Sequence, residues 1–193
     1  MQMRRSAQGF TLIELMVTMA IAAILMTVAA PSFVAFQQNA ELTSLTNSLL
    51  ATINTARSEA MKRGRNAMVI PANGVDWYHG ITVFVDLNGN NAYDASTDLT
   101  VFQFTDPLPA YLKIDGNGPV AASPPYMLFD AQGYPKTTGA AAGNFTLTIQ
   151  RNDLSGNQLL EQTRRIIVAK TGRARTCKPT TLAPNACKAT NAE

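Results

Sequence analysis

The first sixty residues carry two hydrophobic patterns that together predict one long helix. From Phe10 to Ala30 nearly every side chain is apolar or small, and Glu14 is the only charged one. A helix rises about 1.5 Å per residue, so about 20 such residues match the thickness of a bilayer core. We therefore expect residues 10–30 to span a membrane, as the first half of a helix over residues 10–63.

After Pro31 the pattern becomes amphipathic. Apolar side chains recur at spacings of three and four with polar residues between them, at Leu42, Leu45, Leu49, Ile53, Ala56 and Ala60. This stripe predicts a helix that packs one face on a globular domain. Pro31 lacks a backbone N–H and should kink or loosen the helix. Gly64 should end it, after the cations Lys62 and Arg63 in the last turn.

Beyond Gly64 the pattern predicts strands. Short runs rich in β-branched and aromatic residues, bounded by Gly, Pro, Asn and Asp, cover residues 67–70, 81–85, 99–104, 126–129, 145–150 and 158–169. The last two runs should pair through a turn at residues 155–157. A further short strand is expected at residues 111–114, in a connection rich in proline and glycine.

These elements predict an α+β fold with one antiparallel sheet, one face of which is covered by the back half of the helix. Of the 193 residues, about 130 remain outside the helix and the segment before it, which suits one globular domain. We place this domain at residues 64–169 and a tail at residues 170–193.

The net charge of +3 conceals an asymmetry along the chain. Between Asp76 and Asp153 acids outnumber bases, whereas the segment from Arg164 to Lys188 contains bases and no acid. Its bases are Arg164, Arg165, Lys170, Arg173, Arg175, Lys178 and Lys188. The end of the chain is therefore a basic patch.

Glu14 is the unusual residue of the apolar segment. A carboxylate costs about 2.5 to 3.5 kcal/mol at the centre of a membrane helix, so Glu14 should lie near an interface or meet a cation. A secretory signal peptide is the alternative, with Arg4 and Arg5 as its basic region and residues 28–30 as its cleavage site. Glu14 inside the hydrophobic region and Pro31 directly after the cut argue against it.

The heptapeptide Gly9-Phe10-Thr11-Leu12-Ile13-Glu14-Leu15 closely resembles the processing site of type IV prepilins and type II secretion pseudopilins. The resemblance implies that residues 1–9 are a leader that prepilin peptidase removes after Gly9, and that Phe10 is N-methylated. It also implies that Glu14 meets the amino terminus of a neighbouring subunit during assembly. Such pairing would relieve the burial cost of both charges. The implied partners are other major and minor pilins, and the implied location is the inner membrane, then the pilus filament.

Three later segments narrow the resemblance from prepilins in general to one family. Residues 79–90 (HGITVFVDLNGN), 128–133 (LFDAQG) and 166–175 (IIVAKTGRAR) resemble landmarks of the GspH/FimT family of minor pilins and pseudopilins. The family implies the type IV pilin fold, a long N-terminal helix packed on an antiparallel sheet. The chain departs from the common pattern at Ile81, where an aromatic residue usually follows the glycine, and at Asn91, where glycine is usual.

The motif Gly172-Arg173-Ala174-Arg175 places two guanidinium groups at alternate positions, which share a face in an extended segment. Both could then approach one phosphate backbone, and such a cationic cluster suffices for non-specific nucleic-acid binding. By resemblance, FimT-like members capture DNA through a Gly-Arg-x-Arg motif during natural transformation. We predict that double-stranded DNA binds Lys170, Gly172, Arg173, Arg175, Lys178, Lys188, Arg164 and Arg165.

The same residues are compatible with two functions other than DNA binding. One is that of a purely structural, FimU-like subunit of the tip or priming complex, with its arginines solvated or paired with acids of neighbouring pilins. The other is that of a GspH-like pseudopilin of type II secretion. Deleting a DNA receptor should abolish transformation with pili still present, whereas deleting a structural subunit should abolish the pili.

Cys177 and Cys187 are the only cysteines, ten positions apart. In an exported protein, two cysteines so placed predict a disulfide in preference to a redox or metal pair. We expect this bridge to hold the segment after the last strand beside the basic patch.

Candidate chemistry elsewhere is sparse. Oxygen side chains at Asp86, Asn88, Asn90 and Asp94 resemble the start of an EF-hand loop, but its sixth position is Asn91 and its twelfth is Thr97. We therefore predict a polar hairpin in which these side chains bond their own backbone, and no metal site. His79 is the only histidine, which leaves little for a zinc site or a nucleophile with its base. We predict no enzyme and no cofactor, and interpret His79 as a loop or packing residue.

Overall fold

The structure is a computed structural model of the chain, and it describes residues 9–183 and 187. It divides into two compact units, Met1–Glu41 and Leu42–Glu193. Helix α1 (Leu12–Arg63) contributes its first part to one unit and its last part to the other.

In the first unit, α1 presents apolar side chains on all sides. Ile13, Leu15, Ile24 and Phe33 are each more than half exposed. A helix that is hydrophobic all round belongs in lipid or inside a larger assembly. The described part of this chain leaves the apolar surface of the first part of α1 uncovered.

In the second unit, α1 buries the predicted stripe. Leu42, Leu49 and Ile53 are almost completely buried, and Leu45 packs partly against the same core. The helix ends after Arg63 because Gly64 adopts a left-handed φ of 63° and the N–H of Arg65 donates to the carbonyl of Ala60. This is the Schellman arrangement, which satisfies carbonyl groups that the helix end leaves open.

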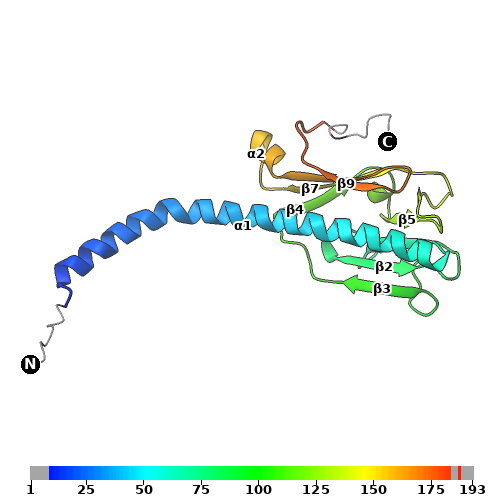
Figure 1. The fold of residues 1–193 in the computed structure, drawn as a ribbon, viewed down its shortest axis with the longest axis horizontal. Helices are drawn as coiled ribbons and strands as arrows, with labels where there is room; N and C mark the ends of the chain where they lie inside the picture. The colour runs from blue at the N-terminus through cyan, green and yellow to red at the C-terminus, as the bar shows by residue number, and fades with distance from the viewer. Residues whose placement is uncertain (1–8, 184–186, 188–193) are drawn as a thin grey trace, which may run out of the picture. The chain divides into compact units, whose positions relative to one another are not determined.

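Two antiparallel sheets pack with the last part of α1 (Figure 1). The five-stranded sheet has the order β3-β2-β1-β5-β6, and the four-stranded sheet has the order β4-β7-β8-β9. Their strands are β1 (Ala67–Pro71), β2 (Ile81–Val85), β3 (Leu99–Phe104), β4 (Leu112–Gly116), β5 (Met127–Phe129), β6 (Pro135–Lys136), β7 (Phe145–Arg151), β8 (Thr163–Val168) and β9 (Ala174–Cys177). Short helices lie between them at η1 (Trp77–His79), η2 (Gly118–Ala121) and α2 (Gly156–Glu161).

The main core lies between α1 and both sheets. In β7, Phe145, Leu147 and Ile149 are buried at alternate positions, as the pattern of this strand predicts. Phe145 meets Phe129 of the other sheet edge to face, with ring centroids 6.1 Å apart. One continuous core therefore joins the two sheets.

A second, smaller cluster covers the other face of the five-stranded sheet. Met68, Phe84 and Leu128 are buried there, and the rings of Phe84 and Tyr93 lie 5.0 Å apart. Strands β1 and β2 are thus buried on both faces. We call the face that carries this cluster the outer face of the five-stranded sheet.

Three expectations from the sequence are wrong. The chain forms two sheets where one was expected. The run predicted as a strand over residues 158–169 begins as the helix α2, because its Gln-Leu-Leu-Glu segment consists of good helix formers, and only Thr163–Val168 is a strand. The segment after residue 169, expected as a tail, contributes the edge strand β9.

Candidate functional site

Residues 9–11, directly before α1, form an exposed, non-helical approach to the helix. Phe10 is 84% exposed, and open space surrounds the position that a Cβ on Gly9 would take. Thr11 caps the helix: its Oγ1 accepts the N–H of Glu14 at 3.3 Å. Threonine followed three residues later by glutamate is the capping-box pattern, which the sequence reasoning missed. A peptide bond after Gly9 is therefore accessible, and Glu14 sits in the first helical turn.

No helix in the described part of the chain is long and apolar enough to cross a membrane by itself. By length and composition, a membrane span is possible only for a bent pair of segments, Leu12–Thr27 with Ser32–Arg63. Pro31 lies in the break between these two segments. The membrane span over residues 10–30 stays a prediction.

The predicted DNA-binding residues separate into exposed and buried groups. Lys170 and Arg173 are exposed in the connection from β8 to β9, and Lys178 is exposed directly after β9. We call these three residues the basic surface. The other described members of the predicted set, Arg164, Arg165, Gly172 and Arg175, are buried or half-buried, and Lys188 lies outside the described residues.

Gly172 sets the conformation of the connection from β8 to β9. The φ of Gly172 is 80°, and its N–H donates to the carbonyl of Ala169 at 2.8 Å. A Cβ at this position would lie 2.1 Å from the carbonyl oxygen of Gly133. Glycine is therefore required here both by the left-handed backbone and by the close approach of a second turn.

Arg57 of α1 is the residue that sequence reasoning missed. Its Nε donates to the carbonyl of Gly133 at 3.0 Å, and its Nη2 lies 3.5 Å from the carbonyl of Thr171. One guanidinium thus ties the turn before β6 and the turn before β9 to the helix. No local pattern could have indicated this, because the two acceptors are 76 and 114 residues away in the sequence.

Arg165 does not belong to a solvated basic face. It is only 5% exposed, and its Nη1 donates to the carbonyl of Ala183 at 2.8 Å. Arg175 is half-buried, and its Nη2 donates to the carbonyl of Cys187 at 3.1 Å. Both guanidinium groups hold the backbone that follows β9. Arg173 and Arg175, predicted to approach one phosphate backbone together, therefore differ in accessibility, since Arg173 is exposed and Arg175 is half-buried.

Arg164 is also partly withdrawn from solvent. Its Nη1 donates to the carbonyls of Glu161 and Thr163. Burial lowers the pKa of the guanidinium groups of both Arg164 and Arg165 from the usual value. Both donate hydrogen bonds to the protein's own backbone.

The predicted disulfide between Cys177 and Cys187 is present, with the two Cα atoms 6.2 Å apart. It joins the last residue of β9 to the segment that Arg165 and Arg175 contact. A bridge across ten positions removes unfolded-state entropy worth about 2.5 to 3 kcal/mol in the chain-entropy model. The bridge and the two arginines act on the same stretch of backbone.

Replacing Arg165 by methionine should lower the free energy of unfolding by about 1.5 to 3 kcal/mol, because carbonyls that accept from a charged donor lose it in a buried place. Urea unfolding of the full chain in detergent measures this change. Lys170→Gln is the control and should change stability by less than about 0.5 kcal/mol, since Lys170 is exposed. Equal midpoints for the two variants would contradict the structural role of Arg165.

Two family models match the chain. The model described as type II transport protein GspH matches residues 45–172, and the model of the prokaryotic N-terminal methylation motif matches residues 4–30. The chain belongs to the GspH family. Members of this family are pilins and pseudopilins that assemble with other pilins in a pilus or pseudopilus.

Individual relatives agree with this family. The chain is 29% identical over 168 residues to the pilin-like protein PilA1 of Thermus thermophilus, a match that covers 87% of this chain and 97% of PilA1. The crystal structure of the type IV minor pilin FimU of Pseudomonas aeruginosa matches with a TM-score of 0.54 and 21% identity, over 79% of this chain and 99% of FimU. These matches confirm the type IV pilin fold.

The loop of this GspH-family chain that resembles an EF-hand bonds its own backbone. The two carboxylate oxygens of Asp86 accept the N–H groups of Gly89 and Asn91. Asn88 and Asn90 each accept an N–H two residues further on. These are the bonds expected of a polar hairpin. Among the described residues, no group of three His, Cys, Asp or Glu side chains is placed to hold a metal ion.

His79, expected as a loop or packing residue, is the last residue of the short helix η1. Its Nδ1 lies 2.9 Å from Oδ1 of Asp76, which also accepts the N–H of Tyr78. The hydrogen bond from His79 holds the pKa of the Asp76 carboxyl below its usual range. This pair is exposed and caps the short helix η1.

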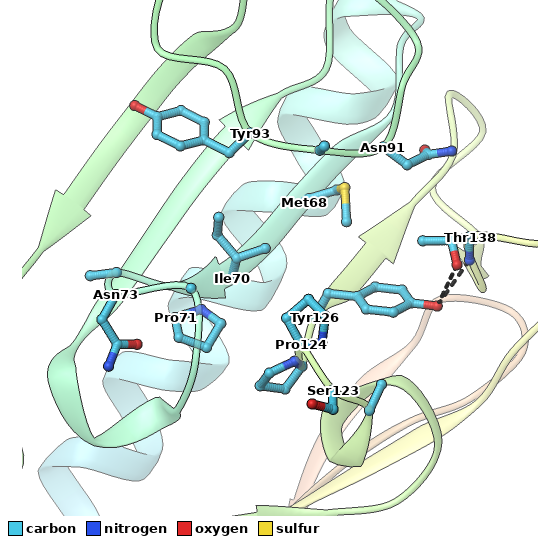
Figure 2. A pocket seen from close by; sticks show the side chains of 15 residues that line it. Met68, Ile70, Pro71, Asn73, Asn91, Tyr93, Ser123, Pro124, Tyr126 and Thr138 are labelled. Atoms are coloured by element: carbon cyan, nitrogen blue, oxygen red, sulfur yellow. Dashed lines mark hydrogen bonds between the residues drawn. The ribbon is translucent and has the colours of Figure 1, made fainter.

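A groove of about 660 Å³ lies on the outer face of the five-stranded sheet (Figure 2). Met68 and Ile70 of β1 lie between Tyr93 and Tyr126, and the hydroxyl of Tyr126 accepts the N–H of Thr138 at 2.9 Å. No charged side chain is among its described lining residues. This groove is therefore no site for a polyanion, and the basic surface is the better candidate.

Proposed function

We propose that this GspH-family chain is a minor type IV pilin that enters the filament through the first part of α1. Prepilin peptidase cuts after Gly9, and the new amino group of Phe10 is methylated. Glu14 then pairs with the amino terminus of a neighbouring subunit. The exposed approach to α1 and the all-round apolar surface of its first part support this sequence of events.

We further propose that the basic surface binds double-stranded DNA during natural transformation. The observation that carries this proposal is the exposure of Lys170, Arg173 and Lys178 around a turn whose backbone is set by Gly172. Backbone phosphates need only cations at reachable spacing, so the affinity should be about micromolar and fall steeply with salt. Arg165 and Arg175 hold the backbone that follows β9, and Arg164 holds the backbone at the start of β8, so these three arginines contribute mainly to structure.

Substituting glutamine for Lys170, Arg173 and Lys178 together should weaken DNA binding at least about tenfold. It should also lower the salt slope by about 0.9 for each phosphate that the variant no longer neutralises. Fluorescence anisotropy with a short duplex, at several salt concentrations, measures both quantities. Lys62 and Arg63 in the last turn of α1, with Arg65 just after it, provide a control with the same change in net charge. Equal weakening in the two triple variants would reduce the effect to net charge alone and reject the site.

A second candidate function is that of a purely structural subunit of the tip or priming complex. The hydrogen bonds from Arg165 and Arg175 to the backbone after β9 favour it, because they give part of the basic patch a structural role. A pseudopilin of type II secretion is the remaining candidate, in line with the description of the matching family model. Deletion separates the three functions, through lost transformation, lost piliation or lost secretion.

A further inference from the structure

Strand β3 forms a free edge of the five-stranded sheet, next to β2 (Figure 1). Its sequence, Leu-Thr-Val-Phe-Gln-Phe, contains no charged residue, proline or glycine. Natural edge strands are usually blunted by charges, prolines, bulges or a covering segment, because an edge offers unpaired backbone N–H and C=O groups. Of these devices, β3 has only the register shift opposite Val83 and Phe84, which precedes residues 102–104. Among the described strands of this sheet, β3 pairs with β2 alone. It is therefore an open template for another strand.

The same strand exposes two aromatic rings. Phe102 and Phe104 are 37% and 51% exposed, and they pair with Val83 and Ile81 of β2. Val83 belongs to the main core, so the rings lie on the face that α1 packs against, at its uncovered margin. The register shift beside Val83 leaves the pairing of residues 102–104 regular. An added strand would meet a regular backbone edge along residues 102–104, beyond the register shift, and an apolar face.

The negative charge around β3 indicates which kind of strand could pair with this edge. From Asn66 to Leu112 the chain contains five aspartates and no lysine or arginine, and four of these aspartates lie outside the core, since only Asp86 is buried. Asp98 directly precedes β3, and the exposed Asp106 follows it by two residues. A strand with cations on both sides of an apolar stretch complements these charges.

A second copy of β3 fits less well. The antiparallel register that places Phe102 opposite its own copy also places Asp98 opposite Asp106. Like charges directly opposite each other destabilise a strand pair. The acidic surroundings of β3 therefore disfavour pairing with itself.

We propose that the free edge of β3 is a docking site for an extended, cation-flanked segment of another pilin subunit, which adds a sixth strand to this sheet. Backbone hydrogen bonds supply most of the affinity, and Phe102 and Phe104 provide the apolar contact. Family members assemble with other pilins, so a neighbouring subunit is a source of such a segment. The docking site is independent of the DNA-binding proposal, because it uses the opposite charge and another sheet.

Synthetic peptides test the docking site on the full chain in detergent micelles. The probe is Lys-Thr-Val-Thr-Val-Thr-Lys, and its matched control is Glu-Thr-Val-Thr-Val-Thr-Glu. We expect the cationic peptide to slow amide hydrogen exchange within β3, and to bind at least about tenfold more tightly than the acidic peptide. Absence of protection by the cationic peptide, or equal binding of both peptides, would overturn the proposal.

A pair of double variants locates the binding. Phe102→Lys with Phe104→Lys should weaken binding of the cationic peptide at least about tenfold. Val75→Lys with Tyr134→Lys adds the same charge at exposed positions outside β3 and should leave protection of β3 in place. Unchanged binding in the first variant would reject the site. Self-association of the native chain that the first variant abolishes would instead assign the edge to a second copy, and the proposal would be wrong.

Discussion

Replacing Gly172 by alanine should lower the free energy of unfolding of the globular unit by about 2 to 5 kcal/mol. The left-handed backbone costs an alanine about 1 to 2 kcal/mol, and forcing an atom into a packed place costs about 1 to 3 kcal/mol more. The added Cβ would lie 2.1 Å from the carbonyl oxygen of Gly133 and 2.8 Å from Nε of Arg57. The turn before β9 must therefore move away from both.

Gly89→Ala is the matched control for this substitution. Gly89 has the same φ of 80° but no atom within 4 Å of its would-be Cβ. The Gly89→Ala variant should therefore lose only the roughly 1 to 2 kcal/mol that the left-handed backbone costs an alanine, the lower part of the loss expected for Gly172→Ala. Urea unfolding of the full chain in detergent, followed by circular dichroism, compares the two variants. A destabilisation of Gly172→Ala no larger than that of Gly89→Ala would mean that the close approach to Gly133 costs nothing.

Replacing Glu14 by glutamine should reduce incorporation into filaments at least about tenfold, if the proposed pairing is worth the roughly 1.4 kcal/mol that a tenfold change requires. The reduction follows because the new amino group of Phe10 in a neighbouring subunit would enter an apolar place without its counter-charge. The start of α1 should persist, since Thr11 caps it through the backbone N–H of residue 14. Quantitative immunoblotting of sheared filaments against membranes measures incorporation.

Two measurements make the result for Glu14 specific to assembly. Mass spectrometry should find Phe10 at the amino terminus and methylated, as in the native chain. Glu41→Gln removes a charge from an exposed part of the same helix and should incorporate normally. Normal incorporation of Glu14→Gln, or an equal defect in Glu41→Gln, would contradict the proposed pairing.

Much of the fold follows from local patterns. The stripe from Leu42 to Ala60 predicts the buried face of α1, and Gly64 ends the helix because glycine alone adopts its φ without strain. Alternation in β7 predicts which of its side chains enter the core. The error at α2 is also local, because a short segment such as Gln-Leu-Leu-Glu, with two adjacent leucines, carries too little periodicity to distinguish a strand from a helix.

The candidate site could be predicted only in part. Sequence reasoning found the cluster of bases but treated its arginines as equivalent. In the structure Arg173 is exposed, whereas Arg165 is buried under the backbone of residues 182 and 183. Both are arginines in a basic segment, so composition does not distinguish them. What separates them is the path of the chain after β9.

The sequence by itself determined the helix, its C-terminal end at Gly64, most strands, the disulfide and the family, because each of these depends on residues close together in the chain or on a short motif. Only the tertiary structure decided that the strands form two sheets, that β3 is left as a free edge, and that Arg57 joins two distant turns. These features depend on which segments meet after folding. A hydrogen bond across 76 or 114 residues leaves no periodic trace in the sequence, since neither partner constrains its own neighbours.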